Sequence, residues 1–270
     1  IELKPKSVEA FNNLAMVYRN QGRYGEAEKL FKDAIKIDPN FLTLYSNLLF
    51  LKSSQADDPK KHIEDAREFG KILSDKVTSP FSEWNIDENP KKLRIGFVSG
   101  DFRHHPVGHF IEHLIKNLKI SSIELYGYTN TFQEDDLTEN FKEYFSVWRQ
   151  LANKDDEEAA NIIHNDNIHI LIDLSGHTDG NRLPVFAWKP APIQVSWLGY
   201  WATTGVNEID YILGDPYVMP KEEAHHFTEK IWHLPDIYSS FTKPIISAEV
   251  NSLPALSNNF ITFGCFNSIA

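Results

Sequence analysis

The chain has 270 residues, of which 41% are hydrophobic and 24% are charged, as is usual for a globular protein. Its formal net charge of −11 argues against a protein that grips a nucleic-acid backbone, because such a protein needs a basic face. The only cysteine, Cys265, excludes an intrachain disulfide and a cysteine-built zinc site, and it favours a reducing, cytoplasmic location. No apolar run approaches the ~18 residues of a membrane-spanning helix.

An internal repeat occupies the first fifty residues. Similar residues recur 34 positions apart, as at Pro5 and Pro39 or at Leu14 and Leu48. Small alanines in this period allow two antiparallel helices to approach closely, and Gly22 supplies the turn between them. The positions that match the tetratricopeptide pattern are Leu14, Ala15, Tyr18, Gly22, Tyr24, Ala27, Phe31, Ala34, Ile35 and Pro39.

One repeat is complete, while residues 1–7 would end a preceding repeat and residues 42–53 would begin the next. A solenoid needs about three repeats to bury its faces. We therefore expect the natural array to extend ahead of Ile1, or another subunit to cover that end. Residues 1–53 are predicted to be the tail of the array.

Residues 54–92 are predicted to form a capping helix and a linker. Asp58 and Pro59 are typical of a helix N-cap followed by proline at the first helical position. The apolar face of this helix would consist of Ile63, Ala66, Phe69, Ile72 and Leu73. The polar, proline-containing stretch 78–92 would be the linker.

From Leu93 onward, predicted strands alternate with predicted helices, which favours a mainly parallel, Rossmann-like sheet over residues 93–259. A last strand, Phe260–Phe266, would open a second α/β lobe in residues 260–270. The expected strands of the first lobe are Leu93–Ser99, Ile123–Thr129, Ile168–Leu174, Gln194–Leu198 and Tyr211–Leu213, and the expected helices are Val107–Leu118 and Glu157–His164.

The segment after the first strand is the leading candidate for chemistry, because ligands of open parallel sheets lie beyond the carboxyl ends of strands. Asp101 and His105 would flank one point there, where they could move a proton or bind a phosphate. Pro106 suits the first position of the following helix, whose free N–H groups could hold an anion. The alternative is that Asp101 is a helix cap and His105 a surface residue.

A competing motif lies in the same helix. His109, Glu112 and His113 match the H-x-x-E-H spacing of one class of zinc proteases. A motif with two free positions arises readily by chance in a chain with 11 histidines. We therefore disfavour zinc hydrolysis.

Two further loops follow predicted strands. In the first, Arg182 could pair with a phosphate or carboxylate, or could be a solvated residue at a helix start. In the second, Gly199 would let a ligand approach the backbone, and Tyr200 and Trp201 offer flat faces on which a sugar ring can stack, although aromatic residues more often belong to the core.

Three stretches together resemble the protein O-linked N-acetylglucosamine transferase family, which includes SPINDLY-type and bacterial members. They read LRIGFVSGDFRHHPVGHF, IHILIDLSGHTDGNR, and APIQVSWLGYWATTG followed by IDYILGDP. The resemblance implies a GT-B fold, with the Rossmann-like N-terminal lobe behind a tetratricopeptide array. It implies inverting transfer of a sugar from UDP-N-acetylglucosamine to serine or threonine hydroxyls of proteins, with no required metal or other cofactor.

The resemblance also implies roles for individual residues. His105 matches the family's essential histidine, and Asp101 matches a carboxylate considered as the base. Leu198 and Gly199 match backbone positions near the donor sugar. The substrate-binding residues predicted beside these two are His109, His177, Arg182 and Trp201.

Departures from the family pattern leave alternatives open. Animal members have tyrosine at His177, lysine at Asp179 and proline at Trp201, so a protein O-fucosyltransferase that uses GDP-fucose stays possible, as does a non-catalytic tetratricopeptide scaffold. Acceptor proteins or peptides would bind through the array. The family's second lobe, which neutralises the leaving diphosphate, would lie beyond Ala270, so we expect the 270 residues alone to be inactive.

Overall fold

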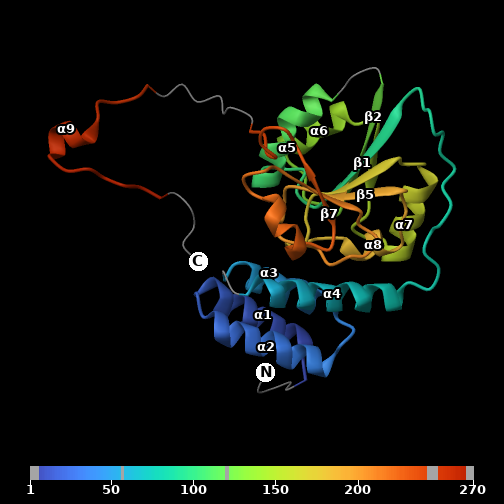
Figure 1. The fold of residues 1–270 in the computed structure, drawn as a ribbon, viewed down its shortest axis with the longest axis horizontal. Coiled ribbons are helices and arrows are strands. Elements are labelled where there is room, and N and C mark those ends of the chain that lie inside the picture. The colour runs from blue at the N-terminus through green and yellow to red at the C-terminus, as the bar shows by residue number, and fades with distance from the viewer. Residues whose placement is uncertain (1–5, 56–57, 119–121, 242–248, 266–270) are drawn as a thin grey trace.

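The computed structural model describes residues 6–55, 58–118, 122–241 and 249–265, so Ile1 and Pro5 lie outside the described residues. Its first part is a helical array of α1 (Val8–Asn20), α2 (Tyr24–Ile37) and α3 (Leu42–Ser53) (Figure 1). Gly22 has a φ of +73° in the turn between α1 and α2, a conformation that glycine adopts without strain. The side chains that pack these helices together include Ala15, Ala27, Phe31, Ala34, Leu44 and Leu51.

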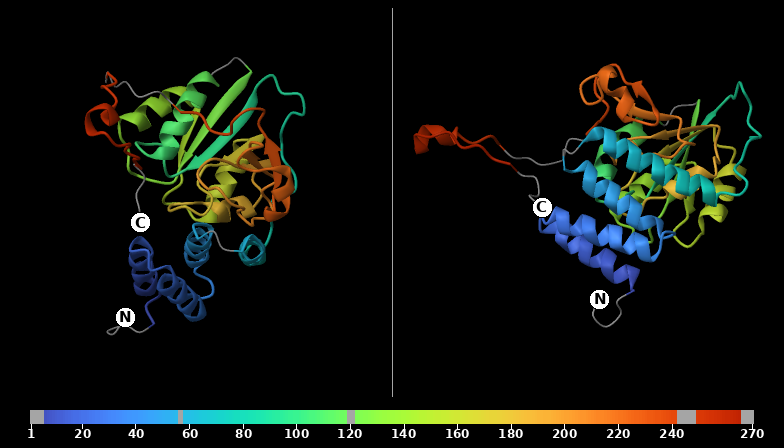
Figure 2. Two further views of the ribbon diagram at one scale, coloured as in Figure 1. Left: turned by 60° about the vertical axis from the view of Figure 1, so that its left-hand side comes forward. Right: turned by 60° about the horizontal axis from the view of Figure 1, so that its bottom comes forward.

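Helix α4 (Pro59–Lys76) begins where the sequence predicts, with Asp58 accepting a hydrogen bond from the Lys60 N–H at 3.0 Å. Its apolar face packs into the core of the lobe as well as against α3. Gly70 allows this close approach, because a Cβ at that position would collide with the carbonyl oxygen of Gly205. Helices α3 and α4 lie against the lobe, whereas α1 and α2 lie farther from it (Figure 2). Helix α4 therefore joins the array to the lobe as well as covering the end of the array.

The lobe contains a seven-stranded parallel sheet with the strand order β3-β2-β1-β4-β5-β6-β7. Strand order reverses between β1 and β4, which is the point where doubly wound sheets bind their ligands. This arrangement confirms the predicted Rossmann-like sheet. The strands are β1 (Leu93–Ser99), β2 (Ile123–Thr129), β3 (Val147–Gln150), β4 (Ile170–Asp173), β5 (Ile193–Ser196), β6 (Tyr211–Gly214) and β7 (Lys230–His233).

Helices cover both faces of the sheet, which explains why its central strands are mostly apolar. Helices α5 (Pro106–Asn117) and α6 (Asp136–Tyr144) pack on one face, in a core that contains Phe97, Phe102 and Ile111. Helices α7 (Asp156–Asn165) and α8 (Leu183–Ala187) pack with α4 on the other face.

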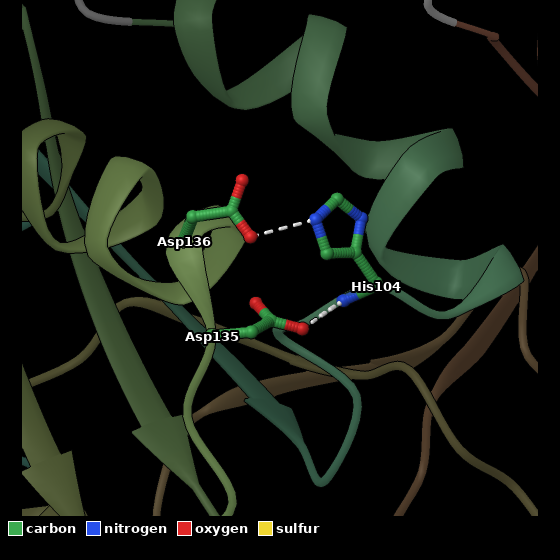
Figure 3. A group of neighbouring side chains, drawn as sticks. All are labelled: His104, Asp135 and Asp136. Atoms are coloured by element: carbon green, nitrogen blue, oxygen red, sulfur yellow. Dashed lines mark hydrogen bonds and ion pairs between the residues drawn. The ribbon is translucent and has the colours of Figure 1, made fainter.

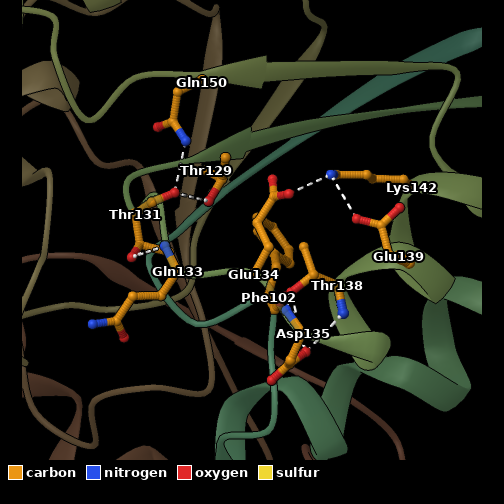
Figure 4. Close-up of polar contacts among 10 residues, drawn as sticks. All are labelled: Phe102, Thr129, Thr131, Gln133, Glu134, Asp135, Thr138, Glu139, Lys142 and Gln150. Atoms are coloured by element: carbon orange, nitrogen blue, oxygen red, sulfur yellow. Dashed lines mark hydrogen bonds and ion pairs between the residues drawn. The ribbon is translucent and has the colours of Figure 1, made fainter.

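Polar contacts fix the loops that follow β1 and β2 (Figure 4). Asp135 and Thr138 form a capping box at the start of α6. The Thr138 hydroxyl also donates to the carbonyl of Phe102 at 2.7 Å, and the Gln150 amide donates to the carbonyl of Thr131 at 2.6 Å. The loop after β1 is therefore anchored to its neighbours on the side of α6.

The last part of the described chain departs from expectation. Beyond β7 the chain forms a short helix, α9 (Pro254–Asn258), and residues 260–265 are not a strand, so the prediction of Phe260–Phe266 is wrong for its described part. Phe260, Ile261 and Phe263 are exposed there. An apolar run becomes a strand only with a neighbour to pair with, and the sheet ends at β7.

The stretch 78–92 contains neither helix nor strand, as expected of a linker, but it packs on the lobe. Phe81 stacks on His164 with ring centroids 3.8 Å apart, and the Trp84 indole donates to the carbonyl of Lys189 at 3.1 Å. Among the described residues, no helix is both long enough and apolar enough to cross a membrane.

Candidate active site

A cavity of about 500 Å³ opens at the point where strand order reverses. One wall is the lobe, including Gly100–Asp101 after β1 and Thr178–Gly180 after β4. The opposite wall is the array, which contributes Met16, Arg19, Asn47 and Phe50. The loops predicted to carry chemistry after β1 and β4 therefore do meet, and the array faces them.

Asp101 and His105 lie together in this cavity. The Nδ1 atom of His105 is 3.5 Å from Oδ2 of Asp101, and the two side chains are 38% and 10% exposed. His105 is the N-cap of α5, and its Nδ1 atom accepts a hydrogen bond from the Val107 N–H at 3.3 Å. Gly108 is required in the first turn of α5, because a Cβ there would collide with the carbonyl of Arg103.

Opposing influences act on the pKa of Asp101. Burial raises the pKa of the Asp101 carboxyl above its ordinary value, whereas the charges of His105 and Arg103 lower it. A neutral His105 that accepts from Val107 has no proton on Nδ1 to offer Asp101. A proton gained at Nδ1 would therefore exchange the Val107 contact for a charged hydrogen bond to Asp101.

Leu198 and Gly199 form a tight turn at the end of β5. Leu198 has a φ of +75°, and the Gly199 N–H donates to the carbonyl of Trp197 at 3.0 Å, which is the rarer and more strained form of γ-turn. A Cβ on Gly199 would collide with the carbonyl of Leu174. Strain of this kind is concentrated at functional positions, where the surrounding structure maintains it.

His177 borders the cavity, but its imidazole is 1% exposed and both ring nitrogens have partners inside the protein. Nδ1 is 3.0 Å from the Ser46 hydroxyl, and Nε2 is 2.9 Å from the carbonyl of Thr204. Burial lowers the pKa of His177 to about 3, so the ring is neutral. The structure therefore does not support direct substrate binding by this ring.

Arg182 is also committed to the protein. Its guanidinium donates to the carbonyls of Leu151, Lys154 and Asp155 at 3.0–3.2 Å and to the side chain of Asn130 at 2.9 Å. It also forms an ion pair of 3.0 Å with Asp156. The prediction that Arg182 binds substrate conflicts with this arrangement, because Arg182 fastens the start of α8 to the loop before α7.

Trp201 does not line the cavity that holds Asp101 and His105. Its indole donates to the carbonyl of Ser53 at 3.3 Å, and its ring lies 5.5 Å from that of Phe50. It lines a second cavity, of about 290 Å³, between α3, α4 and the lobe. His109 lies one turn beyond His105 on α5, with its ring 5.3 Å from that of His104, and it does not line the larger cavity.

One group in the described part of the chain has metal-ligand spacing (Figure 3). Ligand atoms of His104, Asp135 and Asp136 lie within 4.8 Å of one another at the start of α6. Protein contacts account for this proximity, because the His104 N–H donates to Asp135 at 2.7 Å and its Nε2 pairs with Asp136 at 2.9 Å. His109, Glu112 and His113 form no such group within the described residues.

Sequence reasoning missed several residues of the cavity. Arg103 lies between Asp101 and His105 in the sequence and 3.5 Å from Asp101 in the structure, so its location could have been inferred from that short loop. Arg19, Asn47 and Phe50 come from the array, and no local pattern indicates which face of an array meets the lobe.

Comparison with known proteins gives a consistent result. The model of glycosyl transferase family 41 matches residues 66–244, and the tetratricopeptide repeat model matches residues 8–41. A protein of Petunia hybrida named as a probable UDP-N-acetylglucosamine–peptide N-acetylglucosaminyltransferase SPINDLY is 32% identical over 87% of this chain. A Caenorhabditis elegans UDP-N-acetylglucosamine–peptide N-acetylglucosaminyltransferase is 37% identical over 56% of this chain.

The fold matches a solved structure as well. A variant of the Thermobaculum terrenum O-GlcNAc transferase superposes with a TM-score of 0.83 and 31% identity over 88% of this chain. The chain spans 26% of the Petunia relative, 13% of the Caenorhabditis relative and 46% of the Thermobaculum chain. The three names give N-acetylglucosamine as the sugar, and none names fucose.

Proposed function

The chain belongs to glycosyl transferase family 41, and from this premise we propose that it is part of an inverting protein O-N-acetylglucosaminyltransferase. The observation that carries the proposal is the Asp101–His105 pair, which lies in a cavity shared by lobe and array. The donor would be UDP-N-acetylglucosamine, which the names of the relatives give as their donor. The acceptor would be a serine or threonine of a protein or peptide that enters along the array.

In the proposed reaction, the acceptor oxygen attacks C1 of the sugar as the bond from C1 to the diphosphate breaks. The configuration at C1 is inverted, and UDP leaves with the bonding electrons. The hydroxyl proton passes to the Asp101–His105 unit, whose geometry supports this step because a proton on Nδ1 gains a carboxylate partner at 3.5 Å. The charge of the departing diphosphate would be stabilised by groups outside this lobe.

The turn at Leu198 and Gly199 is proposed to contact the donor sugar through its backbone. Its support is the geometry of the turn, which the Gly199 N–H closes by donating to the carbonyl of Trp197, and the close approach of the Leu174 carbonyl, which leaves no room for a Cβ on Gly199. We also propose that transfer needs no metal ion. A cytoplasmic location is proposed as well, and its support is the single cysteine, which is typical of a protein from a reducing compartment.

The direct test is sugar transfer by the protein encoded by the complete reading frame that contains these residues. UDP-N-acetylglucosamine and GDP-fucose are supplied separately with a serine- and threonine-containing protein extract, and the modified peptides are identified by mass spectrometry. We expect N-acetylglucosamine on serine or threonine, with or without EDTA. Transfer of fucose alone would refute the proposed donor, and no transfer from either donor would favour a scaffold.

Replacement of His105 tests the site itself. His105→Ala removes a helix cap, which costs about 1 kcal/mol of stability, and is expected to abolish transfer while the protein stays folded. His104→Ala is the matched control, because His104 is an adjacent, exposed histidine that does not line the cavity. Equal activity of the two variants would remove His105 from the site.

A further inference from the structure

The cavity that holds Asp101 and His105 has walls from two parts of the chain. The lobe supplies the reacting pair, and helix α3 of the array supplies Asn47 and Phe50 on the opposite side. The distance between these walls decides how deeply an acceptor segment can lie. The contacts that join α3 to the loops of the lobe therefore bear on the reaction.

His177 makes the most defined of these contacts. A carbonyl oxygen can only accept, so Nε2 of His177 carries the proton that is donated to Thr204 at 2.9 Å. Nδ1 is then an acceptor, and the Ser46 hydroxyl of α3 donates to it at 3.0 Å. The imidazole is held as one neutral tautomer, because burial keeps its pKa far below neutrality.

The two loops that His177 joins are themselves fixed. Asp173 accepts hydrogen bonds from the N–H groups of Ser175 and Gly176 at 3.0 and 2.8 Å, which sets the loop that leads into His177. Glu229 accepts the Thr204 N–H at 2.8 Å, which sets the loop after β5. Of the two hydrogen-bond partners of His177 among the described residues, Ser46 belongs to the array and Thr204 to the lobe.

Aromatic rings also pack around His177 and restrict its position. The edge of the His177 ring meets Tyr200 with centroids 5.3 Å apart, and Phe69 of α4 contacts it at 4.9 Å. Gly176 must lack a side chain, because a Cβ there would run into the ring of Tyr200. The ring of His177 therefore has little freedom to shift without moving α4 or the residues that follow Gly199.

We propose that His177 is a positioning residue that, through Ser46, sets the spacing between the array wall and the lobe wall of the active-site cavity. This inference rests on the proposed transferase function. It assigns the last helices of the array a part in placing the acceptor hydroxyl over Asp101 and His105, in addition to any capture of acceptors by the rest of the array.

The proposal predicts different effects on two reactions of the donor, namely its hydrolysis by water and the transfer of its sugar to a peptide. The turn proposed to contact the donor sugar is closed by its own hydrogen bond, from the Gly199 N–H to the carbonyl of Trp197, whereas Tyr200 and Trp201 just after it contact α3. Slow hydrolysis of the donor by water needs that turn but not the spacing of the walls. Transfer to a peptide needs both, because a misplacement of about 1 Å is enough to slow a reaction by two orders of magnitude.

Ser46→Ala is the mild test, because it removes one hydroxyl and leaves Nδ1 of His177 without its donor. In the complete protein, we expect kcat/KM for a peptide acceptor to fall about tenfold or more while donor hydrolysis stays within about twofold. His177→Phe should show the same split, and His177→Gln should recover part of the transfer, because its amide can donate to Thr204. The control is Ser54→Ala, at the C-cap of α3, whose hydroxyl donates to the carbonyl of Phe50 in the same helix.

A parallel loss of hydrolysis and transfer would mean a purely structural role and would overturn the proposal. So would unchanged transfer in both Ser46→Ala and His177→Phe.

Hydrogen–deuterium exchange of the 270-residue chain tests the link without any activity. Ser46→Ala is expected to speed amide exchange in residues 175–180 and in α3, and Ser54→Ala is expected not to affect residues 175–180. Unchanged exchange in Ser46→Ala would show that Ser46 does not hold the two walls together. If no variant of the complete protein transfers sugar, the proposed function fails, whereas this measurement still decides whether the link exists.

Discussion

Oδ2 of Asp101 and Nδ1 of His105 face each other at 3.5 Å across four residues of one loop, while Nδ1 accepts a hydrogen bond from the Val107 N–H. Asp101 and His105 can therefore hydrogen-bond to each other only when one of the two facing atoms carries a proton. This property suits a group that must accept a proton from an alcohol as a sugar is transferred.

The raised pKa of Asp101 predicts a pH dependence. Transfer that requires the carboxylate is lost as pH falls through that pKa, which burial places above the ordinary value for aspartate. Asp101→Asn should lower kcat by about 10²-fold or more and should remove this acidic limb from the profile of kcat/KM. The measurement is the peptide transfer rate of both proteins between about pH 5 and 8. An unchanged acidic limb in Asp101→Asn would assign it to another group.

Arg182 is expected to matter for stability and not for affinity. Arg182→Met removes hydrogen bonds to three backbone carbonyls and the ion pair with Asp156, and hydrogen bonds to a charged group contribute about 1.5–3 kcal/mol each. Urea unfolding measures this cost. The control Arg149→Gln removes a more exposed arginine that pairs with Asp166, and it should cost about 1 kcal/mol or less. A stable Arg182→Met protein with weakened donor binding would restore the role predicted from sequence.

Two glycine-to-alanine substitutions should have opposite effects. Gly199→Ala forces a Cβ against the carbonyl of Leu174, so the turn must shift, and we expect a loss of about 1–3 kcal/mol together with weaker donor binding. Gly25→Ala lies within helix α2 with open space around it, and alanine there should add about 0.5–1 kcal/mol. Chemical unfolding and donor titration distinguish the two, and a stable Gly199→Ala protein with normal affinity would contradict the proposed turn.

His177 should make the protein sensitive to acid. Its pKa is about 3 in the folded protein and near the ordinary 6.5 when unfolded, so the unfolded chain binds the proton first as pH falls. Stability that is fully present above pH 6.5 is therefore lost progressively below it. Between about pH 7 and pH 5, the wild type should lose about 2 kcal/mol relative to His177→Gln, which does not titrate. Unfolding free energies of both proteins at the two pH values test this, and parallel changes would contradict it.

Strand bounds and residue proximities could be predicted from the sequence where the contacts that determine them are local. Strands β1 and β2 begin and end at the predicted residues, because each is a mainly apolar run bounded by polar or turn-forming residues. Asp101 and His105 share one short loop, so the strand before them and the proline after them already determine their proximity. The short edge strands β3 and β7 were missed, because four half-polar residues carry no clear periodicity.

The partners of the other candidate site residues depend on packing between segments that are far apart in the chain. His177, Arg182 and Trp201 sit in loops of the predicted kind, but their partners Ser46, Asp156 and Ser53 are chosen by how α3 and α7 pack. A loop histidine that meets a ligand and one that meets a helix have the same local sequence. The tertiary arrangement therefore decides which of these polar side chains are free to bind a substrate.

The close packing of α4 on the lobe also limits how such a protein can change over evolution. Repeats can be gained or lost ahead of α1 without disturbing Phe69 or Gly70, so the reach of the array can vary freely. Replacement of α3 by recombination would instead change one wall of the cavity, and replacement of α4 would change the contact between Gly70 and Gly205. Under the proposed function, acceptor binding and the chemistry can thus change in separate segments, with the boundary between those segments inside the array and not at its end.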